Sequence, residues 1–312
     1  MKEPVAVMFE MSEAARRRLG GRFEVLDLGR QGPAAAAVRR PAGAPVRAAV
    51  TTGLAGFSAA WMDAMPSLAL ICCFGAGHEN LDIEAARSRG IAVTHAPDTN
   101  AETVADHALA LMLAATRDIV GRDRAVRAGE WQAVRTSRPT LAGGNLGIIG
   151  FGPIGRGIAR RAAGFGMNVR YHARHPVAGE PLEFVASAVA LAAASDVLVA
   201  ACPGGPATRH LIGPAVLDAL GPGGFVVNIA RGSVVDTAAL AARLADGRLA
   251  GAGLDVFEDE PGVPDELKRL PNVVLTPHVA GRSPAAERAQ IDLLVHNLAQ
   301  IDRPDALIAR LA

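Results

Sequence analysis

The sequence has little of several features that would place a protein in a specialised class. Its 312 residues include three cysteines and 4% aromatic residues, and the formal net charge is +1. Such a charge balance excludes a polybasic surface built for nucleic acid. The N-terminal stretch lacks the long apolar region of a signal peptide, and acidic residues interrupt the apolar runs before they reach membrane-spanning length. We therefore expect a cytoplasmic protein that binds neither membranes nor nucleic acid.

Several motifs of catalytic and metal sites are also missing. Cys72, Cys73 and Cys202 form no CxxC pair and have no metal-ligand spacing, so we interpret them as small buried apolar residues and expect no metal site. The sequence contains no HExxH, GxSxG or GxxxxGK[ST] motif. Their absence argues against a zinc protease, a serine hydrolase and a P-loop enzyme.

Short apolar runs alternate with longer helical patterns along the chain. The runs are apolar throughout, as strands are when helices cover both faces of a parallel sheet. This alternation predicts an α/β, doubly wound architecture. Strands are expected at 5–9, 23–28, 47–52, 68–73, 90–94, 146–150, 167–171, 196–201, 224–229, 252–257 and 272–276. Helices are expected at 82–89, 101–120, 152–165, 185–194, 236–246 and 283–301.

A glycine-rich turn follows one of these strands. Residues 146–155 read LGIIGFGPIG, in which Gly150, Gly152 and Gly155 form GxGxxG between an apolar strand and a helix. In that context the first glycine permits a tight turn, the second lets the backbone approach a pyrophosphate, and the third lets helix and strand pack closely. The helix N-terminus supplies N–H groups and positive potential to a phosphate. The sequence therefore predicts a dinucleotide-binding fold.

The next strand ends in YHARHP, where an acidic residue would bond the ribose hydroxyls of NAD. Arg174 stands near that position, flanked by His172 and His175, and Arg156 lies in the preceding helix. A guanidinium would bind the 2′-phosphate of NADP through charge-assisted hydrogen bonds, whereas a carboxylate would repel it. We expect NADP(H) to be preferred and NAD(H) to be possible. The alternative is a solvated basic loop.

Three polar residues follow three later strands. Arg231 comes after 224–229, Glu260 after 252–257 and His278 after 272–276. Parallel strands place their carboxyl ends, and hence their ligands, at one edge of the sheet. A histidine can protonate the alkoxide formed when hydride reduces a ketone, a carboxylate can orient it, and an arginine can bind an anionic substrate and polarise its carbonyl. Singly, the three could be a helix-capping cation, a solvated turn residue and a structural histidine, but together they predict an oxidoreductase site.

The chain resembles the D-isomer-specific 2-hydroxyacid dehydrogenase family nearly end to end. The resemblance is carried by residues 75–117, 146–167, 228–261 and 272–281. Within the family, ACPGGPATRHLI (201–212) and YHARHP (171–176) look most like the NADPH-dependent glyoxylate/hydroxypyruvate reductases and their hydroxyphenylpyruvate-reducing relatives. The resemblance implies reduction of a small 2-oxo acid to the D-2-hydroxy acid and a homodimer.

The resemblance also implies a domain division and further site residues. It gives two Rossmann-like domains with an active-site cleft between them. Residues 1–99 with 283–312 would bind the substrate and 100–282 the dinucleotide. Arg231, Glu260 and His278 match the family's catalytic set, and the matched substrate-binding positions are Leu54, Ala76, Gly77, Trp131 and Arg231. The matched cofactor-binding positions are Gly150, Gly152, Pro153, Ile154, Gly155, Arg156, Ala173, Arg174, Cys202, Pro203, Thr208, Ile229, Ala230, Asp255, His278 and Gly281.

Two departures from the family pattern bear on the substrate. His78 and Glu79 stand where relatives often have an apolar or aromatic residue and Asp, and Arg282 adds a cation after His278. Arg282 could favour a second carboxylate or a phosphate on the substrate, or it could face solvent. Other functions remain open, namely an NAD-dependent D-3-phosphoglycerate or phosphite dehydrogenase and a nucleotide-sensing, corepressor-like protein. The complete Arg231, Glu260 and His278 set favours catalysis.

Overall fold

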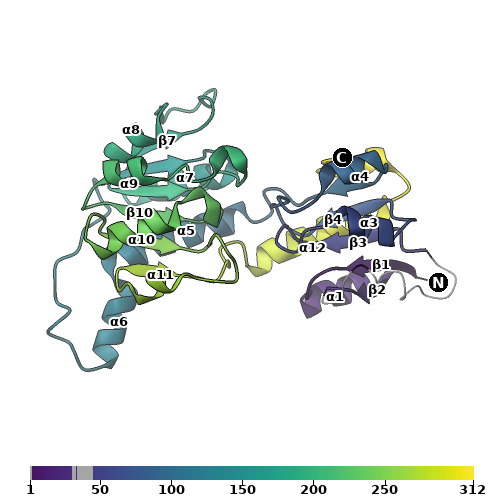
Figure 1. The fold of residues 1–312 in the computed structure, drawn as a ribbon, viewed down its shortest axis with the longest axis horizontal. Coiled ribbons are helices and arrows are strands. Elements are labelled where there is room, and N and C mark those ends of the chain that lie inside the picture. Colours follow the sequence, from purple (N-terminus) through teal and green to yellow (C-terminus); the bar gives the residue numbers. More distant parts are fainter. Residues whose placement is uncertain (1, 30–32, 34–44) are drawn as a thin grey trace. The chain divides into compact units, whose positions relative to one another are not determined.

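The structure is a computed structural model that describes residues 2–29, 33 and 45–312 (Figure 1). The chain divides into two compact units, Met1–Asn100 with Ser283–Ala312 and Ala101–Arg282. Each unit contains one parallel β-sheet with helices packed on it. The expected α/β, doubly wound fold class is therefore confirmed.

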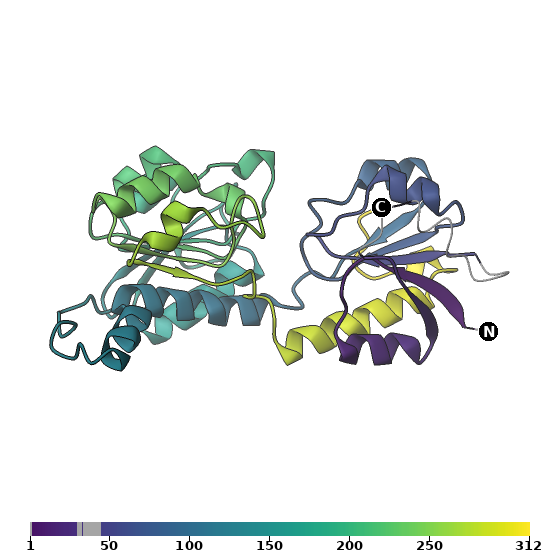
Figure 2. The same ribbon diagram turned by 60° about the horizontal axis from the view of Figure 1, so that its bottom comes forward.

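The first unit is built on a five-stranded sheet with the order β2-β1-β3-β4-β5. In Figure 2, α1 (purple) and α12 (yellow) lie on one face of this sheet, and α3 and α4 (blue) lie on the other. The strands are β1 (Glu3–Val7), β2 (Phe23–Asp27), β3 (Ala48–Thr51), β4 (Leu70–Cys73) and β5 (Ala92–Thr94). The helices are α1 (Glu13–Gly20), α3 (Ala59–Ala64), α4 (Ile83–Ser88) and α12 (Pro284–Ala299), with a 3-10 turn at Pro304–Ala306.

Alternate side chains of these strands enter two separate cores. Val7 on β1 packs with Leu19 of α1 and Ile291 of α12, whereas its neighbour Ala6 joins the core that contains Met62 of α3. Side chains of a strand point alternately to its two faces, so a strand covered on both sides must be apolar at every position. This explains why the strands read as continuous apolar runs.

The second unit is built on a seven-stranded sheet with the order β12-β11-β10-β9-β6-β7-β8. Its strands are β6 (Asn145–Ile149), β7 (Asn168–His172), β8 (Glu183–Phe184), β9 (Val197–Ala200), β10 (Phe225–Asn228), β11 (Gly251–Leu254) and β12 (Val273–Leu275). One core packs this sheet against α5 (Ala101–Arg117) and α7 (Pro153–Gly164). The other core packs it against α8 (Ala188–Ala193), α9 (Pro214–Leu220), α10 (Thr237–Ala245) and α11 (Asp265–Arg269).

The helix expected over 101–120 is two helices. It ends at Arg117, and α6 (Ile119–Arg127) begins after Asp118, whose φ of 55° is left-handed. Aspartate adopts this conformation more readily than most residues. The carboxylate of Asp118 lies 3.9 Å from Arg122 and 3.8 Å from Arg138, which fixes the bend. As a result α6 and the segment after it extend beyond the sheet (Figure 1).

The three cysteines are buried, as expected, and none of them forms a disulfide. Burial raises the pKa of the Cys72 thiol to about 12 and that of Cys202 to about 11, so both stay protonated at neutral pH. Among the described residues, no helix is both long and apolar enough to cross a membrane. The same residues contain no group of three or more His, Cys, Asp or Glu side chains that could hold a metal ion.

Candidate active site

The glycine turn between β6 and α7 has the geometry of a phosphate cradle. Gly150 has a φ of 96°, and a Cβ on it would lie 2.4 Å from the Cys202 nitrogen. A Cβ on Gly155 would lie 2.3 Å from the Gly150 oxygen, whereas one on Gly152 would meet nothing within 4 Å. Gly150 and Gly155 are thus required by packing, and the backbone at Gly152 is open to a ligand. Gly152 also leaves the first turn of α7 without a side-chain cap, so N–H groups there can bind an anion.

The basic side chains of β7 and of the loop after it fall into two groups: those bonded within the protein and those available to a ligand. Arg170 pairs with Glu183 at 2.8 Å, and His172 Nδ1 lies 2.9 Å from the Val185 carbonyl oxygen, so both hold the edge of the sheet. Arg174 and His175 are exposed. Within the part of the chain that the structure describes, Arg174 makes no hydrogen bond or ion pair. Its guanidinium is therefore available to a ligand.

The remaining expected cofactor positions surround the same strand ends. Thr208 donates its hydroxyl to the Pro203 carbonyl at 2.8 Å, which closes the loop after β9. Cys202, Ile229 and Ala230 are buried at the ends of β9 and β10. Pro153, Ile154 and Arg156 form the first turn of α7, Ala173 follows β7, and Gly281 lies in the loop after β12.

Asn228 shapes the turn that carries Arg231. Its side chain is 1% exposed, accepts the Ala230 N–H at 3.0 Å and donates to the Arg231 carbonyl at 3.0 Å. A Cβ on Gly232 would lie 1.9 Å from the carbonyl carbon of Phe257. The turn after β10 therefore packs directly against the loop after β11, which carries Glu260.

Glu260 and His278 form the closest carboxylate–imidazole pair in the loops that follow the strands of the second unit. The His278 Nδ1 lies 2.6 Å from Oε2 of Glu260, and the other carboxylate oxygen accepts the Phe257 N–H at 2.9 Å. The side chain of His278 is 41% exposed and that of Glu260 is 14% exposed. Because the carboxylate can only accept, Nδ1 carries the proton, and Nε2 is left to exchange a proton with a substrate.

Asp255 anchors the loop that carries His278. It is 1% exposed. One of its oxygens accepts the Val279 N–H at 2.9 Å and the Thr276 hydroxyl at 2.6 Å, and the other accepts the Ala280 N–H at 2.9 Å. From α5, His107 Nε2 lies 3.0 Å from the same hydroxyl. Asp255, one of the expected cofactor-binding residues, is therefore also a fixed part of the loop that carries His278.

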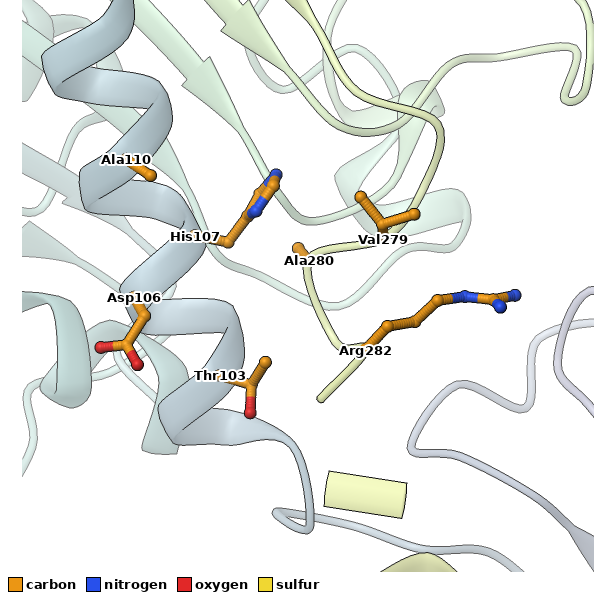
Figure 3. Close-up of a pocket in the computed structure, with 7 residues that line it drawn as sticks. All are labelled: Thr103, Asp106, His107, Ala110, Val279, Ala280 and Arg282. Atoms are coloured by element: carbon orange, nitrogen blue, oxygen red, sulfur yellow. The ribbon is translucent and has the colours of Figure 1, made fainter. Parts of the chain in front are cut away.

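A hollow of about 260 Å³ lies beside this anchor, between α5 and the loop after β12 (Figure 3). Figure 3 shows His107 directed toward the loop and Arg282 extended away from α5. The lining residues are Thr103, Asp106, His107, Ala110, Val279, Ala280 and Arg282.

The expected substrate-binding residues do not gather in one unit. Leu54, which is 66% exposed, and the turn that contains Ala76 and Gly77 belong to the first unit. Trp131 is 58% exposed in the segment after α6 of the second unit.

Sequence reasoning missed a second group of polar residues that support the strand-end loops. Glu258 accepts from His210 at 3.0 Å and from the Thr237 N–H at 3.2 Å, and so ties the loop after β9 to α10. Burial would raise the pKa of Glu258, but these hydrogen bonds outweigh it and hold the pKa below its usual range. Asn228, Thr276 and His107 were also missed. No sequence pattern marks these three residues, because a single polar residue in a strand, a loop or a helix is common.

Comparisons with known proteins identify the family to which the chain belongs. Residues 109–280 match the family described as D-isomer specific 2-hydroxyacid dehydrogenase, NAD binding domain. The chain is 39% identical over 295 residues to hydroxyphenylpyruvate reductase of Plectranthus scutellarioides, covering 94% of each protein. It is 41% identical over 254 residues to a glyoxylate/hydroxypyruvate reductase of Arabidopsis thaliana, covering 81% of each.

A solved structure is similar over the whole length. It is the NADPH-dependent glyoxylate/hydroxypyruvate reductase of Sinorhizobium meliloti in complex with NADP and malonate. The TM-score is 0.89 at 35% identity, and the match covers 100% of this chain and 97% of that one. The expected family is thereby confirmed: the chain belongs to the D-isomer-specific 2-hydroxyacid dehydrogenases and is an oxidoreductase.

Proposed function

We propose that the protein reduces a small 2-oxo acid of the glyoxylate or hydroxypyruvate type to the D-2-hydroxy acid, with NADPH as the preferred reductant. The observation that carries the proposal is the 2.6 Å contact between His278 and Glu260, at strand ends of the sheet that also carries the glycine turn. The residues of that turn fit a dinucleotide, because Gly152 leaves open space beside uncapped helix N–H groups. When bound, the reduced nicotinamide supplies a hydride.

The chain's own residues would provide binding, orientation and a proton. Arg231 and the backbone N–H groups of Ala76 and Gly77 would bind the substrate carboxylate, and Leu54 and Trp131 are proposed to bind the substrate as well. Arg231 also polarises the 2-oxo group. His278 would then donate a proton from Nε2 to the oxygen of the reduced carbon. Glu260 holds the ring by its Nδ1 proton, so that Nε2 keeps a constant direction.

The preference for NADPH rests on Arg174. No carboxylate occupies the end of β7, and Arg174 is exposed and makes no ion pair with any described residue. A guanidinium there binds a 2′-phosphate, whereas an acid would repel it. Arg156 in the first turn of α7 can add a second cation. NADH, which lacks the phosphate, would be a poorer substrate.

The protein is further proposed to act as a homodimer in the cytoplasm. Large apolar side chains are exposed on α6 and just after it, at Ile119, Val126 and Trp131. Exposed apolar residues grouped on an element that extends from the sheet are typical of a surface that binds another protein, here a second copy of the chain.

An absorbance assay at about 340 nm tests the function, because reduced nicotinamide absorbs there. NADPH and NADH would each be combined with glyoxylate, hydroxypyruvate, phenylpyruvate and pyruvate. The proposal expects the fastest oxidation with NADPH and glyoxylate or hydroxypyruvate. Activity only with NADH and 3-phosphohydroxypyruvate, or reduction of NAD+ by phosphite, would instead indicate the NAD-dependent alternatives. Nucleotide binding without turnover of any substrate would indicate a sensor.

A further inference from the structure

Two histidine rings converge on one carbonyl oxygen in the turn between β4 and α4. His78 Nδ1 lies 3.2 Å and His95 Nδ1 lies 3.0 Å from the oxygen of Ala76. A carbonyl oxygen can only accept, so Nδ1 carries the proton in both rings. The rings meet edge to face at 78°, with their centroids 5.0 Å apart. Each ring therefore fixes the other, and together they occupy both lone pairs of one oxygen.

This contact sets the orientation of a single peptide unit. The carbonyl of Ala76 and the N–H of Gly77 belong to the same peptide, and in a trans peptide they point in opposite directions. The two histidines therefore direct the Gly77 N–H away from themselves. Donation to the carbonyl also polarises the peptide and makes its N–H a stronger donor.

The other carbonyls of the turn are held as well. The Gly75 oxygen accepts the Ala96 N–H at 2.8 Å, and the Gly77 oxygen lies 3.0 Å from the Cys73 sulfur. Within the residues described, the N–H groups of Ala76 and Gly77 donate to no other group of the protein. A turn whose carbonyls are all bonded and whose N–H groups remain available is suited to bind an anion.

We propose that His78 and His95 are positioning residues that set the affinity of this turn for the substrate carboxylate. The inference rests on the proposed function, in which Ala76 and Gly77 bind that carboxylate. It also gives the departure from the family pattern at His78 a role in substrate binding. Neither histidine touches the reacting atoms; both act through the Ala76–Gly77 peptide.

The test compares single and double replacements in the full-length protein. Because either ring alone still holds the carbonyl, His78→Phe and His95→Phe should each raise KM for glyoxylate about twofold to threefold. The double variant should raise it about twentyfold, more than the product of the singles, because the two rings share one acceptor. kcat and KM for NADPH should stay within about twofold of wild type. His95→Asn keeps an N–H donor and should retain the wild-type KM.

His296 provides a matched control. Its ring also contacts a backbone carbonyl, that of Ala306 at 3.3 Å, but it lies on α12. His296→Phe should leave KM for glyoxylate unchanged. A double variant with KM near wild type, or with KM for NADPH rising in parallel, would overturn the proposal. If the double variant does not fold, equal KM values for His95→Asn and His95→Leu would overturn it.

A binding experiment separates this inference from the proposed function. Oxalate is titrated into the wild type and the double variant while the amide NMR signal of Gly77 is followed. The signal should shift in the wild type, with an affinity at least tenfold weaker in the double variant. If the wild type reduces no 2-oxo acid but this difference is found, the proposed function fails and the positioning role stands. A Gly77 signal that oxalate does not move in the wild type would overturn the positioning role.

Discussion

Replacing Arg174 with alanine should weaken the binding of NADPH far more than that of NADH. Arg174 is exposed after β7 and has no partner among the described residues, whereas Arg170 is occupied by Glu183 at 2.8 Å. Only NADPH carries a 2′-phosphate for the guanidinium to bind. The change therefore removes an interaction that one cofactor makes and the other lacks.

The size of the effect follows from the exposure of this side chain. A hydrogen bond to a charged group contributes about 1.5–3 kcal/mol, and a guanidinium can make two to a phosphate. Ordering an exposed arginine costs up to about 2 kcal/mol. The net loss is about 1–4 kcal/mol, or about 5- to 1000-fold in the Kd of NADPH. Arg174→Lys keeps the charge without the planar fork, so its loss should be intermediate.

Nucleotide fluorescence titration gives the two dissociation constants directly. NADPH and NADH would be titrated into the wild type, Arg174→Ala and a control. Arg124→Ala is a suitable control, because Arg124 is also exposed, on α6, and has no partner in the described chain. The control should change neither Kd. Equal losses for NADPH and NADH in Arg174→Ala would refute the role of the guanidinium and return the segment to a solvated basic loop.

Three further changes test the loops around the site. Gly232→Ala should destabilise the protein by about 3 kcal/mol in urea unfolding, because its Cβ would lie 1.9 Å from the Phe257 carbonyl carbon; a loss below about 1 kcal/mol would contradict this. Asp255→Asn leaves one loop N–H without its acceptor and should cost about 2 kcal/mol and lower kcat about tenfold, so wild-type kcat would contradict the anchor. Because the pKa of Glu258 is lowered in the folded protein, its carboxylate stabilises the folded state at pH values above the pKa of the unfolded chain, about 4.3. This stabilisation is lost as the pH falls through the pKa of the folded state. From neutral to acidic pH, the free energy of unfolding should therefore fall less in Glu258→Gln than in the wild type, and equal falls would contradict this.

The strand positions and the glycine turn could be predicted because local rules determine them. A strand buried on both faces must be apolar throughout, and GxGxxG between a strand and a helix has few other uses. The same logic placed Glu260 and His278 at the ends of β11 and β12, where the structure brings them together. Carboxyl ends of parallel strands share an edge, so sequence position alone indicated their proximity.

The features that were missed leave no clear pattern in the local sequence. His78 and His95 lie on either side of α4, and no local pattern indicates that both reach the Ala76 oxygen. The break at Asp118 was missed because neither a proline nor a glycine stands at residues 117–119, where α5 ends and α6 begins. The two-residue strand β8 is too short for any period to be visible.

The central claim is that His278, held by Glu260, supplies the proton when a 2-oxo acid is reduced. The most direct measurement is kcat for glyoxylate at saturating NADPH in the wild type and His278→Ala, with NADPH binding followed separately by fluorescence. The account predicts a loss in kcat of about 10²- to 10⁴-fold with the Kd for NADPH nearly unchanged. A His278→Ala variant that turns over glyoxylate within about threefold of the wild-type rate would contradict it.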